Sequence, residues 1–371
     1  MANPLENFLN FRKFGLWKPS NTHVIGIDIG TSSVKVIQLR REKGKAILET
    51  YGEIATGPYR DLSVGQAAIL TPDKTVEMLK DLFREANVTT TQASVSIPLS
   101  SSLLMIIEIP KVSKEMLAKV IPIEARKYIP VPIAEVALDW WVIPTPANAN
   151  AAEPAKNTLE VLVVAIHNSI INQYQDLSQT LAVQPAFFEI ETFSAIRSVY
   201  SGDMAPTVIL DMGAGSTKMA IVDYGIVRLS HTIPKGSQDI SIALSRALGV
   251  DFAKAEEIKR KVGLVERYDG KEVTPTVSNI VEYIFSEVNK VLSSYQTKQR
   301  RSVNKIILIG GGSLLRGLLD VASKSFEVPV LLGKPFEKVE APAFLQNILA
   351  EAGPGFAVSI GLALRHLQTL D

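Results

Sequence analysis

The sequence contains no cysteine among its 371 residues, which excludes disulfides, thiolate metal sites and cysteine nucleophiles. Its four histidines are scattered, and no spacing puts two of them on one helix face, so we expect no zinc site. The sequence also lacks apolar runs of about 18 residues, the length of a membrane-spanning helix, and the apolar core of a signal peptide. These absences favour a cytoplasmic protein.

An excess of charge of either sign is also lacking. The 39 basic and 38 acidic residues leave a formal net charge of +1, and no basic stripe is present. We therefore expect no nucleic-acid partner. The motifs GxxxxGK[ST], GxGxxG and GxSxG do not occur, which argues against P-loop NTPases, Rossmann dehydrogenases and serine hydrolases.

The chain does contain enough apolar sequence for two folded domains, with 46% hydrophobic and 21% charged residues. Strand and helix patterns predict an α/β fold whose first domain covers residues 21–98 and 184–204. A β-α-β-β-α module at 99–183 is predicted to be inserted in it, and 205–371 to form the second domain. Residues 1–20 are predicted to be a tail, with aromatic side chains that contact a membrane surface, a partner or the tail's own domain.

An internal repeat is the main functional signal. Residues 27–35 read IDIGTSSVK, and residues 210–218 read LDMGAGSTK. In both copies an apolar strand ends in Asp, a glycine follows two residues later and a lysine seven residues later. The second copy lies 183 residues after the first. A repeat over this distance is better support for a function than either hairpin alone, each of which by itself could be an ordinary tight turn.

The chemistry of these hairpins fits phosphate. Turns built from Gly, Ser and Thr leave backbone amides and hydroxyls uncovered, and such concavities bind anions. Asp beside a triphosphate would be repelled unless a cation lay between them, so Asp28 and Asp211 are candidate Mg²⁺ residues, acting through coordinated water. The candidate phosphate-binding residues are Gly30, Thr31, Ser32, Ser33 and Lys35 in the first hairpin and Gly213, Gly215, Ser216 and Thr217 in the second.

A third glycine cluster follows the predicted strand at 305–309. Gly310, Gly311 and Gly312, followed by Ser313, stand where a helix is expected to begin. Glycines at such a junction let a nucleotide lie against the backbone, although they also occur there for packing alone.

The order of these three motifs resembles the actin-like ATPase superfamily, in which they are the two phosphate motifs and the adenosine motif. The resemblance implies a two-domain actin-like (ribonuclease H-like) fold that binds ATP and Mg. The segment at 255–259, AEEIK, is similar to a helix of bacterial actins, which implies that Glu256 and Lys259 lie near ribose and adenine. The superfamily's water-positioning acid falls on Glu191, with Glu189 as the rival. Asp28, Asp211 and Glu191 are therefore the implied catalytic residues.

Two further segments narrow the resemblance. Residues 124–132, EARKYIPVP, with 135–140, EVALDW, are similar to the inserted module of the PilM family of type IV pilus assembly proteins. Residues 353–365, GPGFAVSIGLALR, resemble that family's C-terminal stretch. PilM-like proteins share the architecture of the division protein FtsA, which implies an inserted FtsA-type 1C subdomain. FtsA usually ends in an amphipathic membrane helix, and no such tail precedes Asp371, which favours the pilus family.

The resemblance implies an ATP-binding platform on the inner face of the cytoplasmic membrane, held there through its partners. The partners implied are the cytoplasmic N-terminal tail of an inner-membrane protein, PilN, and the pilus assembly ATPase. The tail would bind in a groove between the first domain and the module. Candidate groove residues are Tyr128, Ile129 and Pro130, whose alternative role is core packing. An FtsA-like filament protein is the second reading and a kinase of the same superfamily the third, and ATP hydrolysis is expected to be slow at most.

Overall fold

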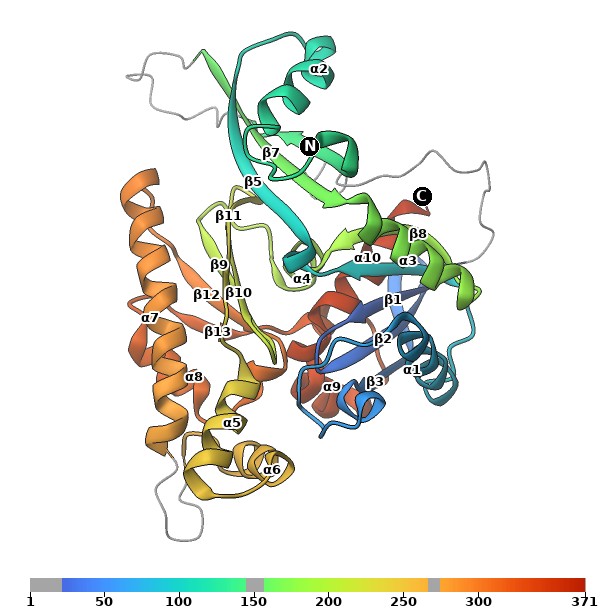
Figure 1. Cartoon of the computed structure of the whole chain (residues 1–371), viewed down its shortest axis with the longest axis vertical. Coiled ribbons are helices and arrows are strands. Elements are labelled where there is room, and N and C mark those ends of the chain that lie inside the picture. Colours follow the sequence, from blue (N-terminus) through green and yellow to red (C-terminus); the bar gives the residue numbers. More distant parts are fainter. Residues whose placement is uncertain (1–21, 145–156, 266–273, 371) are drawn as a thin grey trace.

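The computed structural model describes residues 22–144, 157–265 and 274–370 (Figure 1). The predicted tail at 1–20 and nearly all of the loop expected at 145–157 lie outside the described residues.

The first sheet has five strands in the order β3-β2-β1-β4-β8. Strands β1 to β3 form an antiparallel meander, and β4 and β8 run parallel to β1. The meander follows from alternating apolar residues interrupted by the tight turn that was predicted after Ile29. The strands are β1 (His23–Ile29), β2 (Ser33–Glu42), β3 (Lys45–Ala55), β4 (Gln92–Ile97) and β8 (Gln184–Ile190).

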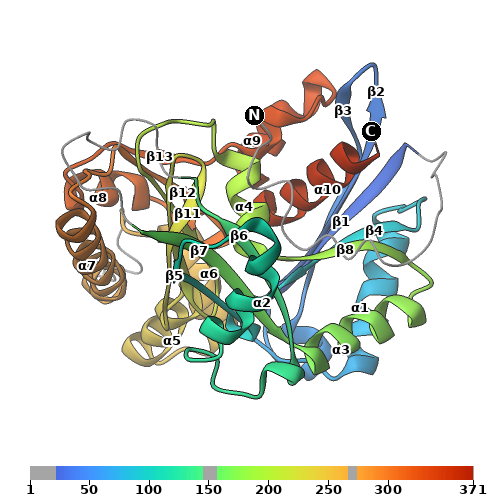
Figure 2. The same cartoon turned by 90° about the horizontal axis from the view of Figure 1, so that it is seen from above.

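Helices cover both faces of this sheet (Figure 2). Helix α1 begins after Thr71, whose side chain accepts a hydrogen bond from the Lys74 amide, with Pro72 at the first helical position as predicted. The helices are α1 (Pro72–Glu85) and α3 (Asn168–Thr180), which contact each other, and α4 (Glu191–Val199) and α10 (Ala357–Thr369), which also contact each other.

The second sheet repeats this plan in the order β11-β10-β9-β12-β13. Three antiparallel strands are again followed by two parallel ones, so the repeat seen in the hairpins extends to the whole sheet. The strands are β9 (Thr207–Met212), β10 (Thr217–Asp223), β11 (Ile226–Ile233), β12 (Lys305–Ile309) and β13 (Val330–Leu332). The helices of this half are α5 (Ser237–Leu248), α6 (Phe252–Val262), α7 (Thr274–Gln299) and α8 (Leu318–Ser325). Helix α9 (Gln346–Ala352) packs on the first domain, since its Leu349 lies in one apolar cluster with Val24 and Ile37 of the first sheet.

The inserted module is a three-stranded antiparallel sheet, β5-β7-β6, with one helix on it. Its core includes Ile109 and Ile121. The elements are β5 (Ser102–Pro110), α2 (Lys114–Ala125), β6 (Val136–Val142) and β7 (Thr158–His167). Trp140 and Trp141 lie on opposite sides of β6, and both are half-buried.

Helix α3 was predicted as the module's second helix, but its buried face belongs to the first domain. Ile171 lies in the same apolar cluster as the first sheet, with Tyr174 and Leu177 packed against it. The helix begins directly after β7 and therefore links the module's sheet to the first domain.

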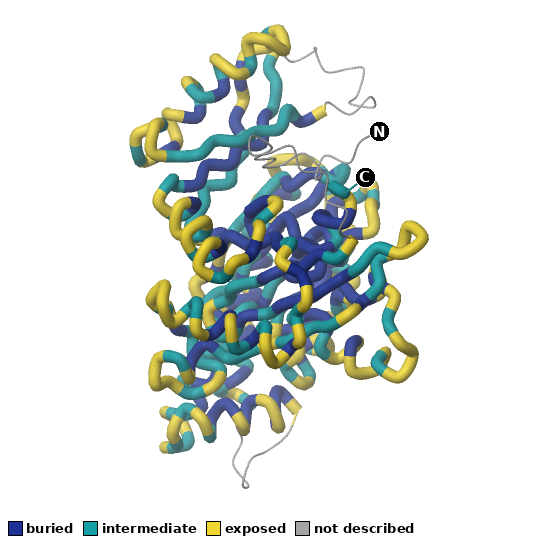
Figure 3. The backbone as a smooth tube through the Cα atoms, turned by 90° about the vertical axis from the view of Figure 1, so that its right-hand side faces the viewer, coloured by how far each residue is buried: buried dark blue, intermediate teal, exposed yellow. Residues whose placement is uncertain are grey.

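The C-terminal helix α10 packs on the first sheet, although the predicted boundary assigned it to the second domain. A Cβ added to Gly26 of β1 would lie 2.1 Å from the backbone carbonyl oxygen of Ser359. A Cβ added to Gly361 would lie 1.8 Å from the backbone carbonyl oxygen of Ser194. Glycine thus allows α10 to lie against β1 on one side and α4 on the other. Figure 3 shows this region as the buried middle of the molecule.

Contrary to the sequence expectation, the helical stretch Ala343–Thr369 is apolar and long enough to span a membrane, with a mean hydropathy of 1.3. Its most apolar part is 61% buried inside the protein. The high hydropathy of α10 therefore reflects its place in the core between the first sheet and α4.

Candidate nucleotide site

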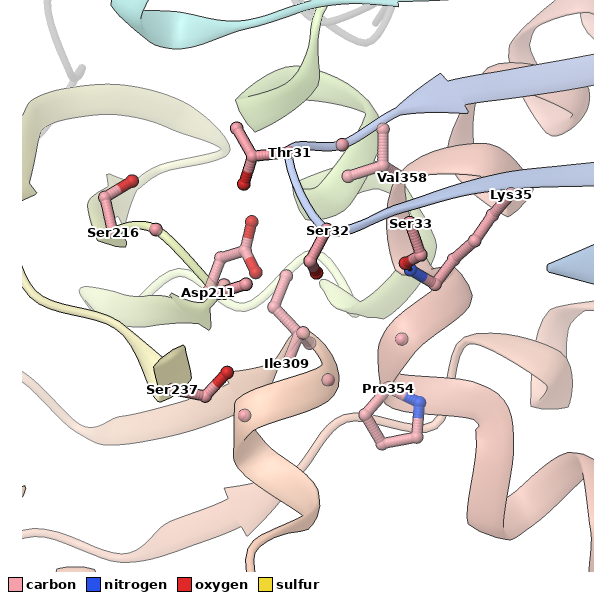
Figure 4. A pocket seen from close by; sticks show the side chains of 18 of the residues that line it. Thr31, Ser32, Ser33, Lys35, Asp211, Ser216, Ser237, Ile309, Pro354 and Val358 are labelled. Carbon is pink, nitrogen blue, oxygen red and sulfur yellow. Dashed lines mark hydrogen bonds between the residues drawn. The ribbon is translucent and has the colours of Figure 1, made fainter. Parts of the chain in front are cut away.

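A cavity of about 410 Å³ lies where the two halves of the molecule meet. Both repeated hairpins line it, and Figure 4 shows Thr31 and Ser32 of the first hairpin near Asp211 and Ser216 of the second. The predicted residues that line it are Asp28, Gly30, Thr31, Ser32, Ser33, Lys35, Glu191, Asp211, Gly213, Gly215, Ser216, Glu256, Lys259, Gly310, Gly311 and Gly312. The fold thus brings residues from both ends of the chain to one space.

The two hairpins have the same turn. The Gly30 amide donates to the backbone carbonyl oxygen of Ser33 at 3.1 Å. The Gly213 amide donates to the backbone carbonyl oxygen of Ser216 at 3.1 Å. Each turn encloses two further backbone amides, which make no hydrogen bond to the part of the chain that the structure describes. These amides belong to Thr31, Ser32, Ala214 and Gly215. Each hairpin therefore offers uncovered donors to an anion in the cavity.

Asp28 and Asp211 end the equivalent strands β1 and β9. Burial raises the pKa of Asp28 to about 6, while Lys35 and a hydrogen bond from the Ser96 hydroxyl at 3.0 Å oppose the shift. Burial also raises the pKa of Asp211, against the charge of Lys218. Two half-buried carboxylates with raised pKa values are a functional signal, because a cation would relieve the cost of their charge.

Two equivalent lysines face these carboxylates. Lys35 donates to the Ser33 hydroxyl at 2.6 Å and lies 3.1 Å from a Glu53 oxygen. Lys218, which the repeat matched to Lys35 but which was not among the predicted site residues, lines the cavity from β10. Burial alone would lower the pKa of Lys218, but the negative charges of Glu191 and Asp211 outweigh it and raise the pKa.

Glu191 is the first residue of α4 and is held from two sides. One carboxylate oxygen accepts the Leu99 amide at 2.6 Å, and the other accepts from Lys218 at 2.6 Å. It lines the cavity, as the resemblance implied.

The rival Glu189 lies on β8 and does not line this cavity. It is fully buried and accepts from Arg197 at 2.7 Å, from Arg365 at 2.5 Å and from the Ser194 hydroxyl. Burial alone would raise its pKa, but the two arginines lower it to about 2. This ion cluster joins α4 to α10, so Glu189 has a structural role.

The glycine cluster after β12 separates into two kinds of position. A Cβ on Gly310 would lie 2.3 Å from an Asp211 carboxylate oxygen, and one on Gly312 would lie 2.7 Å from the Met212 oxygen. These glycines allow β12 to approach the second hairpin. A Cβ on Gly311 would meet nothing within 4 Å, so this residue borders open space in the cavity.

Two predicted binding residues point away from the cavity. The Thr217 hydroxyl is buried and donates to the Lys235 oxygen at 2.9 Å. The Ser313 hydroxyl donates to the Gly310 oxygen at 2.7 Å. Both predictions are wrong: the Thr217 hydroxyl bonds to the segment that follows β11, the Ser313 hydroxyl closes a local turn, and neither residue lines the cavity.

On the far side of the cavity, helix α6 contributes a set of charges. Glu256 accepts from Lys259 at 2.6 Å, from Arg260 at 2.8 Å and from the Ser241 hydroxyl at 2.6 Å. Glu256 and Lys259 are buried and line the cavity, as the resemblance implied. Burial lowers the pKa of Lys259 despite the neighbouring Glu256.

Residues 61–70, called the strap below, connect both halves across this site and were missed from the sequence. The Ala68 amide donates to the Thr31 oxygen at 2.8 Å, and the Ala67 amide donates to the Gln238 side chain at 3.0 Å. Gly65 lies so close to Glu256 that a Cβ would be 2.7 Å from its carboxyl carbon. The strap is irregular, so no periodicity marks it in the sequence. Other lining residues that were missed are Glu53, Pro98, Ser100, Ser237, Arg260, Pro354 and Gly355.

The residues present fit a nucleotide with its cation. The uncovered amides and lysines suit phosphates, and Gly311 gives a flat ligand room against the backbone. Across the described ranges, no group of three His, Asp or Glu side chains is placed to hold an ion. A Mg²⁺ ion here would therefore take ligands from phosphate and water as well as from Asp28 or Asp211.

Comparison with known proteins places the chain in a family. Residues 26–367 match the family model of the type IV pilus assembly protein PilM. The chain belongs to the PilM family. The solved PilM-PilN type IV pilus biogenesis complex has a TM-score of 0.77 at 23% identity, over 93% of this chain and 98% of that one.

More distant relatives share the fold. The ethanolamine utilization protein EutJ of Carboxydothermus hydrogenoformans has a TM-score of 0.55 at 14% identity, over 95% of this chain and 93% of that one. MreB5 of Spiroplasma citri bound to ADP has a TM-score of 0.50 at 11% identity, over 95% and 98%. The predicted actin-like fold is confirmed; the FtsA-type identity of the PilM-family module stays a prediction.

Curated relatives are FtsA proteins. That of Helicobacter pylori is 26% identical over 237 residues, which is 56% of this chain and 47% of that protein. The FtsA of Bacillus subtilis is 20% identical over 380 residues, 89% of this chain and 82% of that protein. The chain spans about half the length of the first of these.

A second cavity, of about 160 Å³, lies between the first domain and α3 of this PilM-family chain. It shares Ile29, Gly30, Thr31 and Pro98 with the nucleotide cavity. Its other walls come from the strap, α1 and α3 and include Ile69, Leu70, Met78, Tyr174 and Leu177.

The predicted groove residues lie elsewhere. Tyr128 and Pro130 are exposed at the outer end of the module, and Ile129 is buried in the module's core. Ile129 therefore has the packing role that was the alternative. The 160 Å³ cavity beside α3 lies between the first domain and a part of the predicted module.

Proposed function

We propose that this chain is an ATP-binding component of type IV pilus assembly, acting at the inner face of the cytoplasmic membrane. The observation that carries the nucleotide part is the meeting of two equivalent hairpins across one cavity, each preceded by a half-buried Asp whose pKa is raised. The pilus part rests on membership of the PilM family.

In this proposal the amides of both hairpins bind the phosphates, and Lys35 and Lys218 neutralise part of their charge. Asp28 and Asp211 would hold a Mg²⁺ ion through coordinated water molecules. The ion would shield the charge of the phosphates and stabilise the negative charge that develops on the leaving group. Glu191, fixed by Leu99 and Lys218, is placed to accept a hydrogen bond from an attacking water. Because Lys218 holds one oxygen of Glu191, we expect hydrolysis to be slow at most.

We also propose that the cytoplasmic tail of a PilN-like membrane protein binds in the 160 Å³ cavity, since a PilM-family relative was solved with PilN. The cavity's mostly apolar walls suit leucine- or isoleucine-like side chains. Ile69, which is 82% exposed, is the apolar residue at its rim that an incoming peptide would cover.

The shared wall supports coupling between peptide and nucleotide. Gly30 and Thr31 face the phosphate cavity on one side and the apolar cavity on the other. Burial, followed by the charges of Glu191 and Asp28, raises the pKa of Tyr174, so the apolar cavity lies within the field of the nucleotide site. A ligand that shifts the hairpin therefore changes the affinity of the other site, and the effect is reciprocal.

The test is calorimetric titration of the purified chain with a peptide copying that tail, with and without Mg-ATP. We expect saturable binding, with an affinity that depends on nucleotide. Ile69→Asp should weaken peptide binding, while Phe344→Asp, on a side chain that is 80% exposed outside this cavity, should not.

If Ile69→Asp leaves peptide binding unchanged, the peptide binds at another surface of the protein. Normal ATP binding without any peptide binding would contradict the platform role and favour an FtsA-like filament protein, which sedimentation with ATP would then detect. Absence of ATP binding would contradict the nucleotide site itself.

A further inference from the structure

Helix α2 at the end of the module has two apolar faces. Ile121 and Ala125 are buried against the module's sheet. Met116 and Ile123, two helical turns apart, lie on the opposite side, where Met116 is 44% and Ile123 is 65% exposed. Tyr128, 57% exposed, follows the helix. These three residues are called the tip stripe below.

Positive charge is concentrated around the tip stripe. Residues 111–127 contain five Lys or Arg and two Glu, a net charge of +3, whereas the whole chain carries only +1. Lys119 and Arg126 are exposed beside the stripe. Lys127 pairs with Glu124 at 2.5 Å, so one of the two acids of this segment is already paired with a cation.

The shape of this region suits a flat surface. Helix α2 lies at one end of the long axis of the molecule (Figure 1), and Figure 3 shows that end as largely exposed or half-buried. Neither of the two cavities described above is lined by α2 residues, so neither offers a groove for a bound peptide there. A projecting helix with an outward apolar stripe can touch a planar surface without displacing the rest of the module.

We propose that the tip stripe and its flanking cations bind the surface of an anionic membrane. Apolar side chains flanked by Lys and Arg are typical of helices that lie in a lipid interface, where the long basic side chains reach the headgroups. Each Lys or Arg near an anionic surface strengthens binding about fivefold. Three exposed apolar side chains are too few for stable insertion, so the contact is reversible and orients a protein that its partners already hold nearby.

This inference goes beyond the proposed function and requires neither nucleotide nor a PilN-like tail. The full chain is mixed with vesicles of phosphatidylcholine alone, or of phosphatidylcholine with phosphatidylglycerol, and bound protein is measured by flotation. We expect binding to the anionic vesicles only, weakening as salt is raised. Ile123→Asp and the pair Lys119→Glu with Arg126→Glu should each reduce it at least tenfold.

The matched control is Ile348→Asp on α9, where the side chain is 53% exposed. It introduces the same charge outside the tip and should leave vesicle binding unchanged. Thermal unfolding of each variant checks that its fold is intact. Equal binding to neutral and anionic vesicles, or an equal loss in Ile348→Asp, would overturn the proposal. So would a wild-type chain that binds no vesicles but self-associates through α2, since the stripe would then be a contact between copies.

Discussion

Gly65→Ala tests whether the strap closes the nucleotide site. Gly65 has a φ of +90°, and a Cβ there would lie 2.7 Å from the carboxyl carbon of Glu256. Glu256 cannot retreat easily, because Lys259, Arg260 and Ser241 hold it at 2.6–2.8 Å. The strap is therefore expected to withdraw from α6. The hydrogen bond from the Ala67 amide to the Gln238 side chain should then be lost.

The expected effect follows from the strain. A non-glycine residue held at such a φ costs about 1–3 kcal/mol, which corresponds to a roughly five- to 150-fold weaker nucleotide affinity if the closed strap belongs to the bound state. Because the strap is an exposed irregular segment, its withdrawal should leave the midpoint of thermal unfolding nearly unchanged.

The assay is a fluorescence titration with an ATP analogue, with release followed by stopped flow. Gly44→Ala is the control, since Gly44 has a φ of +78° but nothing within 4 Å of an added Cβ, and it lies in the turn between β2 and β3. It shares the backbone strain and should not alter nucleotide binding. Wild-type affinity and release rate in Gly65→Ala would refute the closing role of the strap.

Four other outcomes are expected. Since burial raises the pKa of Asp28 to about 6, the benefit of Mg²⁺ for nucleotide binding should fade as pH falls through about 6, and titrations from pH 8 to 5 would reveal it. The same raised pKa means that the ionised form of Asp28 destabilises the fold. Asp28→Asn should therefore raise the free energy of unfolding by up to about 3 kcal/mol above pH 6, and this gain should vanish as pH falls toward 4. Denaturant melts that show no such gain would contradict the burial argument. Gly361→Ala should lower the midpoint of thermal unfolding steeply, because its Cβ would lie 1.8 Å from a backbone oxygen, whereas Gly311→Ala should spare stability and weaken nucleotide binding. Glu191→Gln should slow whatever ATP hydrolysis is measured without a large change in ATP affinity, and equal rates in both proteins would remove Glu191 from the reaction.

Much of the site could be predicted because its chemistry is local. A strand ending in Asp, followed by a Gly, Ser and Thr turn, is written in nine consecutive residues and occurs twice. The choice between Glu189 and Glu191 could not be made this way. They are two residues apart, yet one lies on β8 among two arginines and the other begins α4 at the cavity.

The sequence by itself determined the two hairpins and their Asp and Lys residues, since turn chemistry and strand patterns act over a few neighbouring residues. The order of the three motifs carried the resemblance to the actin-like class. The tertiary structure alone decided that the Thr217 hydroxyl bonds to Lys235, that the strap lies across the nucleotide cavity, and that α10 returns to the first sheet. Each of these depends on contacts between segments far apart in the chain, such as Gly65 with Glu256 and Gly26 with Ser359. Side-chain direction and long-range packing are set by what the rest of the fold brings alongside, and local pattern does not carry that information.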